Sequence, residues 1–199
     1  MAPRPERAAL RERYERRQQE MVDTAARVFA QRGYEQTTVQ ELTEAMGLAA
    51  GALYHYFGSK EQLLIRICDE LVEPLLVQAR ALLRSAGTPE QQFRALVRLW
   101  VEHVTAHRDH MLVFEQHRAA IEAGDQWREV RASRKQFQRL VEKALDGALD
   151  GAGTDRRLAL SALLGMVNYT AQWYRPRGRL APAQIADGYV DLVLGRPGA

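Results

Sequence analysis

The sequence "GLAAGALYHYFGSKEQLL", residues 47–64, places three aromatic residues and one histidine at positions 54–57. Aromatic residues this dense usually belong to a hydrophobic core. Consecutive residues of a helix project in different directions, however, so these four side chains cannot all face inward. Some of them must therefore point toward solvent or toward a partner of the protein.

Two capping boxes and a glycine divide the surrounding residues into short helices. The run "TVQE" (38–41) has a hydroxyl at the N-cap position and Glu three residues later, which predicts a helix over 38–46 that Gly47 ends. A second helix is expected over 49–57, and "SKEQ" (59–62) predicts the start of a long third helix. Two short helices joined by a tight turn are the pattern of a helix-turn-helix, whose second helix enters the major groove of DNA.

The helical register separates the aromatic cluster into an inner and an outer face. Leu53 and Phe57 are four residues apart and share the face that packs on the preceding helix. Tyr54 and His55 then point away from the core, and Tyr56 falls near the edge. Their hydroxyl and imidazole groups suit phosphates and base edges. The alternative is a helical core with a Tyr-rich surface patch, because helix-turn-helix spacing alone is common.

The longer run "TTVQELTEAMGLAAGALYHYFGSKEQLL" (37–64), preceded by "AARVFAQRGYEQ" (25–36), closely resembles the N-terminal domain of TetR-type transcriptional regulators. The resemblance covers about residues 18–65 without a gap. It implies that the threonine opening the second helix and the aromatics of the third contact DNA, that a small residue permits close approach, and that the lysine after the turn holds a phosphate. The DNA-binding residues expected on this basis are Thr38, Ala50, Gly51, Tyr54, His55, Tyr56 and Lys60.

One departure from the family pattern affects how DNA would be read. Family members usually carry a polar or basic residue at the front of the recognition helix, where this chain has Ala49 and Ala50. Neither side chain can cap the helix or hydrogen-bond a base, although contact with thymine methyl groups remains available. We expect few direct base hydrogen bonds and more reliance on Tyr54, on the basic N-terminal arm and on DNA shape.

The composition is that of an ordinary globular protein. The chain has 199 residues, 46% of them hydrophobic and 27% charged. It contains no apolar run long enough to span a membrane, and its N-terminus lacks the apolar segment of a secretory signal. Cys68 is the only cysteine, so no internal disulfide can form and a reducing cytoplasm is the expected location.

Positive charge is unevenly placed along a chain whose net charge is only +3. Residues 1–20 carry six Arg against four Glu, and a second basic group lies at Arg175, Arg177 and Arg179. A basic arm suits a polyanion such as DNA. The alternative is a solvated helix face, because many of these Arg stand beside Glu at helical spacing.

Nearly all of the chain reads as helix, which predicts an all-α fold. A long helix is expected over residues 5–32, and Pro74 should kink or divide the helix that begins near Ser59. Further helices are expected over about 90–106, 109–123, 125–149, 155–174 and 182–194. Because no flexible linker interrupts them, we expect a helix-turn-helix DNA-binding domain with its basic arm over 1–58, joined directly to a larger ligand-binding and dimerisation domain over 59–199.

An apolar stripe on the last helix requires a partner. The residues that we expect in a dimer interface are Ile185, Gly188, Tyr189 and Leu192. The glycine would allow a close helix crossing, and the TetR resemblance implies a four-helix interface between two subunits. A palindromic operator also requires a two-fold symmetric protein. The alternative is that this helix packs only on its own domain.

The segment "LLGMVNYTAQWYRPRGRLAPAQIADGYVDLVLGR" (163–196) resembles the end of acyl-CoA-responsive regulators of lipid, steroid or aromatic-acid breakdown. Arg side chains suit the phosphates of a CoA group, and aromatic side chains offer flat apolar area. The expected ligand-binding residues are Trp100, Phe114, Asn168, Trp173, Arg175 and Arg177. The alternative is that these Arg pair with helix C-terminal carbonyls and that the aromatics are simple core.

Four histidines, His103, His107, His110 and His117, suggest a metal site by their spacing. A helix boundary near Arg108 would rotate the last two away from the others, and no cysteine or close carboxylate pair completes a ligand shell. We therefore expect buried or pocket-lining histidines, with no metal and no cofactor.

The leading hypothesis is a repressor that a small hydrophobic effector, an acyl-CoA thioester, releases from a palindromic DNA operator. One rival is a regulator of a multidrug efflux pump that senses lipophilic cations through Glu115, Glu122 or Asp125. An enzyme is a second rival, although the sequence contains no nucleophile elbow, P-loop, dinucleotide fingerprint or HExxH motif. A third is a non-specific DNA-coating protein.

Overall fold

The computed structural model describes residues 5–49, 51–149 and 155–195, and within these ranges every regular element is a helix. The predicted all-α fold is confirmed. The chain divides into two compact units, Met1–Cys68 and Asp69–Ala199. Within the ranges given, none of the helices combines the length and apolar composition needed to cross a membrane.

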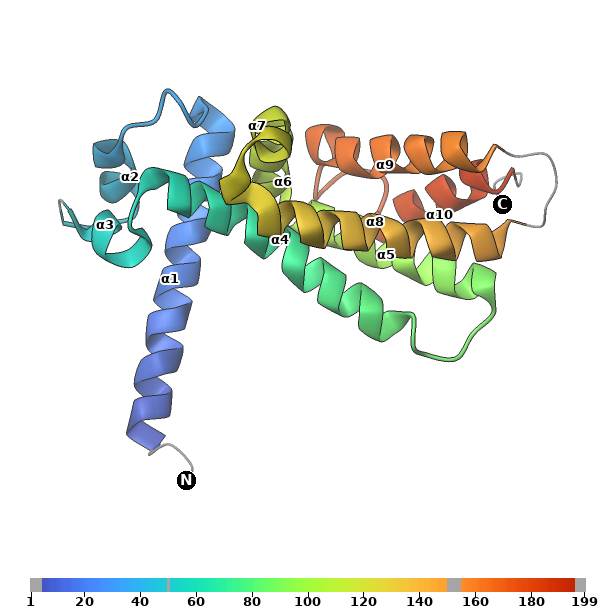
Figure 1. The fold of residues 1–199 in the computed structure, drawn as a ribbon, viewed down its shortest axis with the longest axis horizontal. Helices are drawn as coiled ribbons and strands as arrows, with labels where there is room; N and C mark the ends of the chain where they lie inside the picture. Colours follow the sequence, from blue (N-terminus) through green and yellow to red (C-terminus); the bar gives the residue numbers. More distant parts are fainter. Residues whose placement is uncertain (1–4, 50, 150–154, 196–199) are drawn as a thin grey trace. The chain divides into compact units, whose positions relative to one another are not determined.

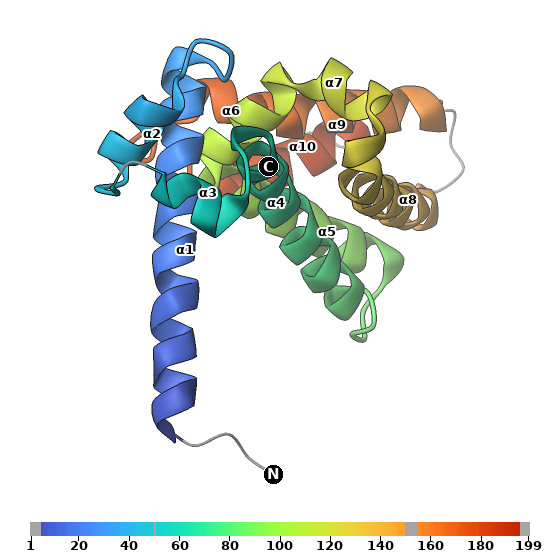
Figure 2. The same ribbon diagram turned by 60° about the vertical axis from the view of Figure 1, so that its left-hand side comes forward.

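The first unit contains α1 (Pro5–Arg32), α2 (Val39–Ala45), α3 (Ala52–Phe57) and the start of α4 (Lys60–Leu82). Helix α2 packs against both α1 and α3. The N-terminal half of α1 extends well beyond α2 and α3, as both ribbon views show (Figures 1 and 2). The predicted basic arm is therefore helical from Pro5 onward.

The C-terminal half of α1 forms the core of the first unit. Val22, Ala25, Ala26 and Phe29 are fully buried at the predicted spacing i, i+3, i+4, i+7. Gly33 follows with φ 85°, a left-handed conformation that glycine adopts without strain, and ends the helix. Residues 9–20 are mostly polar instead, and their Arg and Glu side chains are exposed to solvent.

Helices α2 and α3 begin in different ways. Thr38 caps α2 through the predicted box: its hydroxyl accepts the Glu41 amide at 3.2 Å, and the Glu41 carboxylate accepts the Thr38 amide at 2.7 Å. Helix α3 begins at Ala52 and not at Ala49, which corrects the predicted start. Gly51 precedes it in the left-handed conformation (φ 84°), and no side chain caps the helix.

Helix α4 belongs to both units, with the division between Cys68 and Asp69. It continues without interruption through Pro74, so of the two predicted outcomes, a kink or a division, the division is excluded. A proline removes one hydrogen bond from a helix, and the bonds of the adjoining turns hold α4 together. The predicted boundary between residues 58 and 59 lies just before this helix.

The second unit is a bundle of the remaining helices around α5. Its further elements are α5 (Pro89–Ala106), α6 (Arg108–Gln116), α7 (Arg118–Ala123), η1 (Asp125–Trp127), α8 (Arg128–Ala148), α9 (Arg156–Trp173) and α10 (Pro182–Val193). Helix α5 packs against α8, α9 and α10, and α9 also packs against α6, α8 and α10. The long helices α8 and α9 run side by side in Figure 1.

The helix predicted over residues 109–123 is two helices. His117 lies between α6 and α7 with φ −103° and ψ 10°, a conformation that ends the first helix. The predicted helix over 125–149 likewise begins with the 3-10 turn η1 before α8. Both breaks let the chain change direction between neighbouring helices of the bundle.

An ion-pair network joins α5 to α10. Asp187 accepts hydrogen bonds from Arg98 at 2.6 and 2.8 Å and from Arg94 at 3.3 Å, and Asp191 accepts one from Arg94 at 2.7 Å. The hydrogen bonds from Arg98 lower the pKa of Asp187 below its ordinary value, with a smaller contribution from Arg94. The last helix is therefore bound to its own unit by charge as well as by apolar packing.

Candidate functional site

The aromatic cluster of α3 has the two faces that the sequence predicts. Leu53 is fully buried and Phe57 is half-buried. Tyr54 is 55% exposed and His55 is also exposed, so the phenol hydroxyl and the imidazole face solvent. A short helix thus presents one hydroxyl and one imidazole, both able to donate and accept hydrogen bonds.

Tyr56 lies between these faces and contacts α1. Its ring stacks on that of Tyr14 with the centroids 5.8 Å apart, and it meets the His55 ring edge-on at 5.6 Å. Tyr14 could not be predicted from the sequence, because nothing local indicates that the polar half of α1 reaches the end of α3. The stack holds this part of α1 against α3.

Two further predicted residues lie at helix starts. Thr38 is exposed, although its hydroxyl is engaged in the capping box of α2. Lys60 is the first residue of α4. Its ammonium group lies 4.1 Å from the centre of the Tyr34 ring and makes a cation–π contact with it. Gly51 is exposed ahead of α3, and Ala50 lies outside the described residues.

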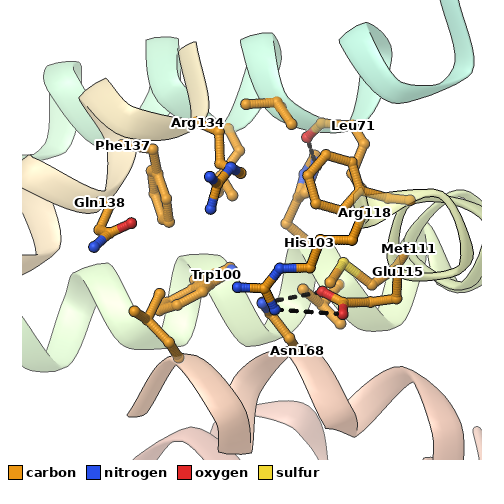
Figure 3. A pocket seen from close by; sticks show the side chains of 15 residues that line it. Leu71, Trp100, His103, Met111, Glu115, Arg118, Arg134, Phe137, Gln138 and Asn168 are labelled. Atoms are coloured by element: carbon orange, nitrogen blue, oxygen red, sulfur yellow. Dashed lines mark hydrogen bonds and ion pairs between the residues drawn. The ribbon is translucent and has the colours of Figure 1, made fainter. Parts of the chain in front are cut away.

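A pocket opens in the second unit between α4, α5, α6, α8 and α9 (Figure 3). The pocket has a cavity volume of about 60 Å³, and most of its lining is apolar. Trp100 and Phe137 meet edge-to-face there, with ring centres 5.1 Å apart. The apolar lining consists of Leu71, Val72, Leu75, Trp100, Val104, Met111, Phe114, Phe137 and Leu164.

Polar side chains form the outer part of the pocket. The Glu115 carboxylate accepts a hydrogen bond from Asn168 at 3.3 Å and lies 3.8 Å from the Arg118 guanidinium, and Figure 3 shows these three side chains close together. Arg134 extends from α8, and its guanidinium pairs with Glu122. Together with Gln138, these side chains also line an adjoining, more open cavity of about 490 Å³.

His103 lines the pocket and is bonded to the backbone of α4. Its Nε2–H donates to the Leu71 carbonyl oxygen at 2.7 Å, which places the proton on Nε2. Burial lowers the pKa of His103 to about 4, and the neighbouring His107 adds to the decrease. The imidazole is therefore neutral near pH 7.

The four histidines do not meet as metal ligands in the part of the chain that the structure describes. The rings of His103 and His107 lie 4.2 Å apart, and that of His110 lies 5.9 Å from His107. His107 Nδ1–H donates to the backbone carbonyl of His103 at 3.0 Å. Ring contacts and backbone hydrogen bonds thus account for their proximity.

The structure divides the predicted ligand-binding residues into two groups. Trp100, Phe114 and Asn168 line the pocket together. Trp173, Arg175 and Arg177 do not line it: α9 ends at Trp173, and the two Arg are exposed in the loop beyond it, so their part in ligand binding stays a prediction. The cations beside the pocket are instead Arg118 and Arg134, which sequence reasoning missed because only the tertiary fold brings α7 and α8 together.

The predicted interface residues of α10 also fall into two groups, one packed within its own unit and one exposed. Ile185 is 4% exposed and belongs to the core of its own unit, and the Tyr189 hydroxyl is hydrogen-bonded to Thr170 at 2.9 Å. Gly188 and Leu192 are exposed, with Leu192 at 71%. The neighbouring helix α9 exposes further large apolar side chains, namely Leu158, Tyr169 and Trp173.

Models of two protein families match the two units. The model for bacterial regulatory proteins of the tetR family matches residues 21–67, and the model for the tetracyclin repressor-like C-terminal domain matches residues 86–196. The HTH-type transcriptional repressor KstR2 of Rhodococcus jostii (strain RHA1) is 28% identical to this chain over 182 residues, which is 89% of each chain.

Solved structures of similar proteins show the same fold. AibR, crystallised with isovaleryl coenzyme A and operator DNA, has a TM-score of 0.75 and is 29% identical, over 90% of this chain and 99% of that one. The ketosteroid transcriptional regulator KstR2 of Mycobacterium tuberculosis has a TM-score of 0.82 and is 23% identical, over 90% of this chain and 93% of its own. With both of its units matched by family models, the chain belongs to the TetR family of transcriptional regulators, as a DNA-binding repressor of the TetR type.

Proposed function

We propose that this protein represses transcription as a homodimer on a palindromic operator and that an acyl-CoA thioester releases it. The observation that carries the effector proposal is the two-part pocket of the second unit. A small apolar chamber opens into a larger polar cavity beside Arg118 and Arg134. An acyl-CoA has the same division, with an apolar acyl group joined to a large, polar and anionic carrier.

The first unit would supply the DNA contacts. Exposed Tyr54 and His55 on α3 offer hydrogen bonds to phosphates or base edges, and Lys60 adds a positive charge at the start of α4. The amides at the start of α4 also favour an anion. The expected contacts of Thr38, Gly51 and Tyr56 are part of this proposal.

The second unit would supply the effector site. Arg guanidinium groups bind phosphate oxygens through paired hydrogen bonds, and Arg118 and Arg134 both face the polar cavity. Arg134 also keeps a buried Nε–H for which the described residues provide no acceptor. AibR, a similar protein of known structure, was crystallised with isovaleryl coenzyme A. These observations together favour an acyl-CoA over a neutral lipid.

A dimer interface would use the exposed apolar face of α9 and α10. Tyr169 and Leu192 are among the large side chains left in solvent by a single chain. Exposed apolar patches of this kind usually mark protein–protein contacts. A homodimer would also match the two-fold symmetry of a palindromic operator.

The rival effector is a lipophilic cation, which would need an acid without a partner in the pocket. Glu115 lines the pocket but is already bonded to Asn168 and paired with Arg118. Glu122 is paired with Arg134. A cation would therefore have to displace an Arg, which disfavours the drug-sensing hypothesis.

The test combines footprinting with effector titration. The proposal predicts discrete protection of a palindrome and release of that DNA by CoA thioesters at concentrations where free CoA and a lipophilic cation such as ethidium have little effect. Uniform coating of DNA would support non-specific binding instead. Release by the cation alone would move the drug-sensing hypothesis ahead.

A further inference from the structure

The mainly apolar pocket between α4, α5, α6, α8 and α9, called the chamber below, is small. Its cavity volume is about 60 Å³. An apolar cavity of about 150 Å³ in another protein binds one benzene molecule, which has six carbon atoms. On that scale the chamber has room for about two to four carbon atoms. A fused ring system or a long straight chain does not fit within it.

The walls of the chamber resist expansion. Trp100 and Phe137 pack edge-to-face at 5.1 Å, and both are nearly fully buried. His103 is bonded to the Leu71 carbonyl oxygen at 2.7 Å, so moving this ring would break a hydrogen bond inside the core. Forcing extra methylene groups into a well-packed interior displaces side chains and costs binding energy. The volume of the chamber would therefore limit the size of the acyl group that binds there.

The polar cluster at the entrance sets where the acyl group begins. Glu115, Asn168 and Arg118 lie at the boundary between the chamber and the outer cavity, since they line both. A thioester carbonyl is a hydrogen-bond acceptor, and the Asn168 amide at this boundary is a donor. The carbonyl would stay at this boundary, and only the carbon atoms beyond it would enter the chamber.

We propose that the effector carries a short acyl group of about three to five carbons in total, straight or branched, and that the Trp100–Phe137 pair sets this limit. The proposal rests on the acyl-CoA function proposed above and names the acyl class within it. It separates this protein from regulators that sense steroid-derived or long-chain acyl groups.

The experiment is a titration of the full-length protein with a series of CoA thioesters, followed by calorimetry. The series contains free CoA and the acetyl, propionyl, isobutyryl, isovaleryl, hexanoyl, octanoyl and benzoyl thioesters. We expect affinity to rise about fourfold for each added carbon that fits, up to four or five carbons. It should then fall at least about tenfold for octanoyl-CoA and benzoyl-CoA.

A matched pair of variants tests whether the volume of the chamber sets the preferred length of the acyl group. Phe137→Leu enlarges the chamber, whereas Phe93→Leu makes the same change at a fully buried α5 position that does not line it. The first variant should move the optimum one or two carbons longer, and the second should leave the order of affinities unchanged. Val104→Ala and Val101→Ala form a milder pair of the same design, for use if either Leu variant fails to fold.

Two failures are distinguishable in this design. Affinity that rises steadily to octanoyl-CoA or benzoyl-CoA, or an optimum that neither pocket variant moves, would overturn the short-acyl inference and leave the acyl-CoA function intact. Absence of binding for every thioester, with the protein still bound to DNA, would overturn the proposed effector class, and the short-acyl inference with it.

Discussion

At the scale of single residues, the proposed DNA-binding face depends on how a few side chains are held. Lys60 is oriented by the Tyr34 ring, so its charge is fixed near the start of α4 and not free to move through solvent. Tyr54 is more than half exposed, and its hydroxyl faces solvent. The two residues can therefore be altered with little effect on the core of the first unit.

Two conservative substitutions distinguish recognition of the DNA bases from binding to the DNA phosphates. Tyr54→Phe should weaken binding to the specific operator by about 1–3 kcal/mol if the hydroxyl reads a base. Lys60→Met keeps the apolar stem but removes the charge, so it should weaken all DNA sequences alike and reduce the salt slope by about one. Gel-shift titrations at several salt concentrations measure both effects. Unchanged affinity in both variants would contradict the assignment of this face.

His103 predicts a dependence of stability on pH. Burial lowers the pKa of His103 to about 4, below its ordinary value of 6.5, so the unfolded chain binds its proton more readily. The stabilisation is present above pH 6.5 and is lost as the pH falls from there toward 4. His103→Gln keeps a donor for the Leu71 carbonyl but cannot titrate. Between pH 7 and pH 4.5, wild type should lose up to about 3 kcal/mol more unfolding free energy than the variant in urea. Parallel pH profiles would contradict this account.

At the scale of helices, capping residues and glycines in the sequence predict where several helices begin and end. They do not predict which helices contact one another. The capping box at Thr38 and the glycine at position 33 each satisfy a backbone requirement within a few residues, so both are readable in the sequence. The start of α3 is set by Gly51, which has a left-handed conformation. The alanines before it favour helix, so the sequence predicts a start that is too early. The omission of Arg134 has a different cause, because a residue's distance from a pocket depends on how helices far apart in sequence pack.

The ion-pair network between α5 and α10 predicts which carboxylate contributes to the stability of the second unit. Asp187→Asn removes the acceptor shared by Arg94 and Arg98 and should lower the free energy of unfolding by about 1–2 kcal/mol. Asp146→Asn is the control, since its pair with Arg156 at 3.6 Å is more exposed and should contribute less than about 0.5 kcal/mol. Urea unfolding at pH 7 measures both. Equal losses would mean that the network adds nothing beyond an ordinary surface pair.

At the scale of the whole molecule, the proposed function requires two subunits and a link between effector and DNA. Helix α4 is continuous from the first unit into the wall of the pocket, where Leu71, Val72 and Leu75 line the chamber. An effector in the chamber would therefore press on the same helix that begins at Lys60. A ligand shifts such an equilibrium only if it prefers one arrangement of the protein over another.

Gly188 offers a clean test of dimerisation. A Cβ atom added there meets no side chain beyond its chain neighbours and no backbone of another helix within 4 Å, so Gly188→Leu should fold normally as a single subunit. If α10 crosses its partner closely at this point, the variant should lose the dimer and operator affinity together. Ala81→Leu, on the exposed surface of α4, is the control and should change neither. A Gly188→Leu protein that sediments as a dimer and binds operator normally would place the glycine outside the interface.

The central claim is that one protein couples acyl-CoA binding to DNA release, and reciprocity provides its most direct test. The measurement is the affinity for isovaleryl-CoA of the free protein and of the protein saturated with operator, together with the affinity for operator with and without the thioester. The account predicts that operator weakens thioester binding by the same factor by which the thioester weakens operator binding, typically about 5- to 150-fold. Thioester binding that operator leaves unchanged would contradict it.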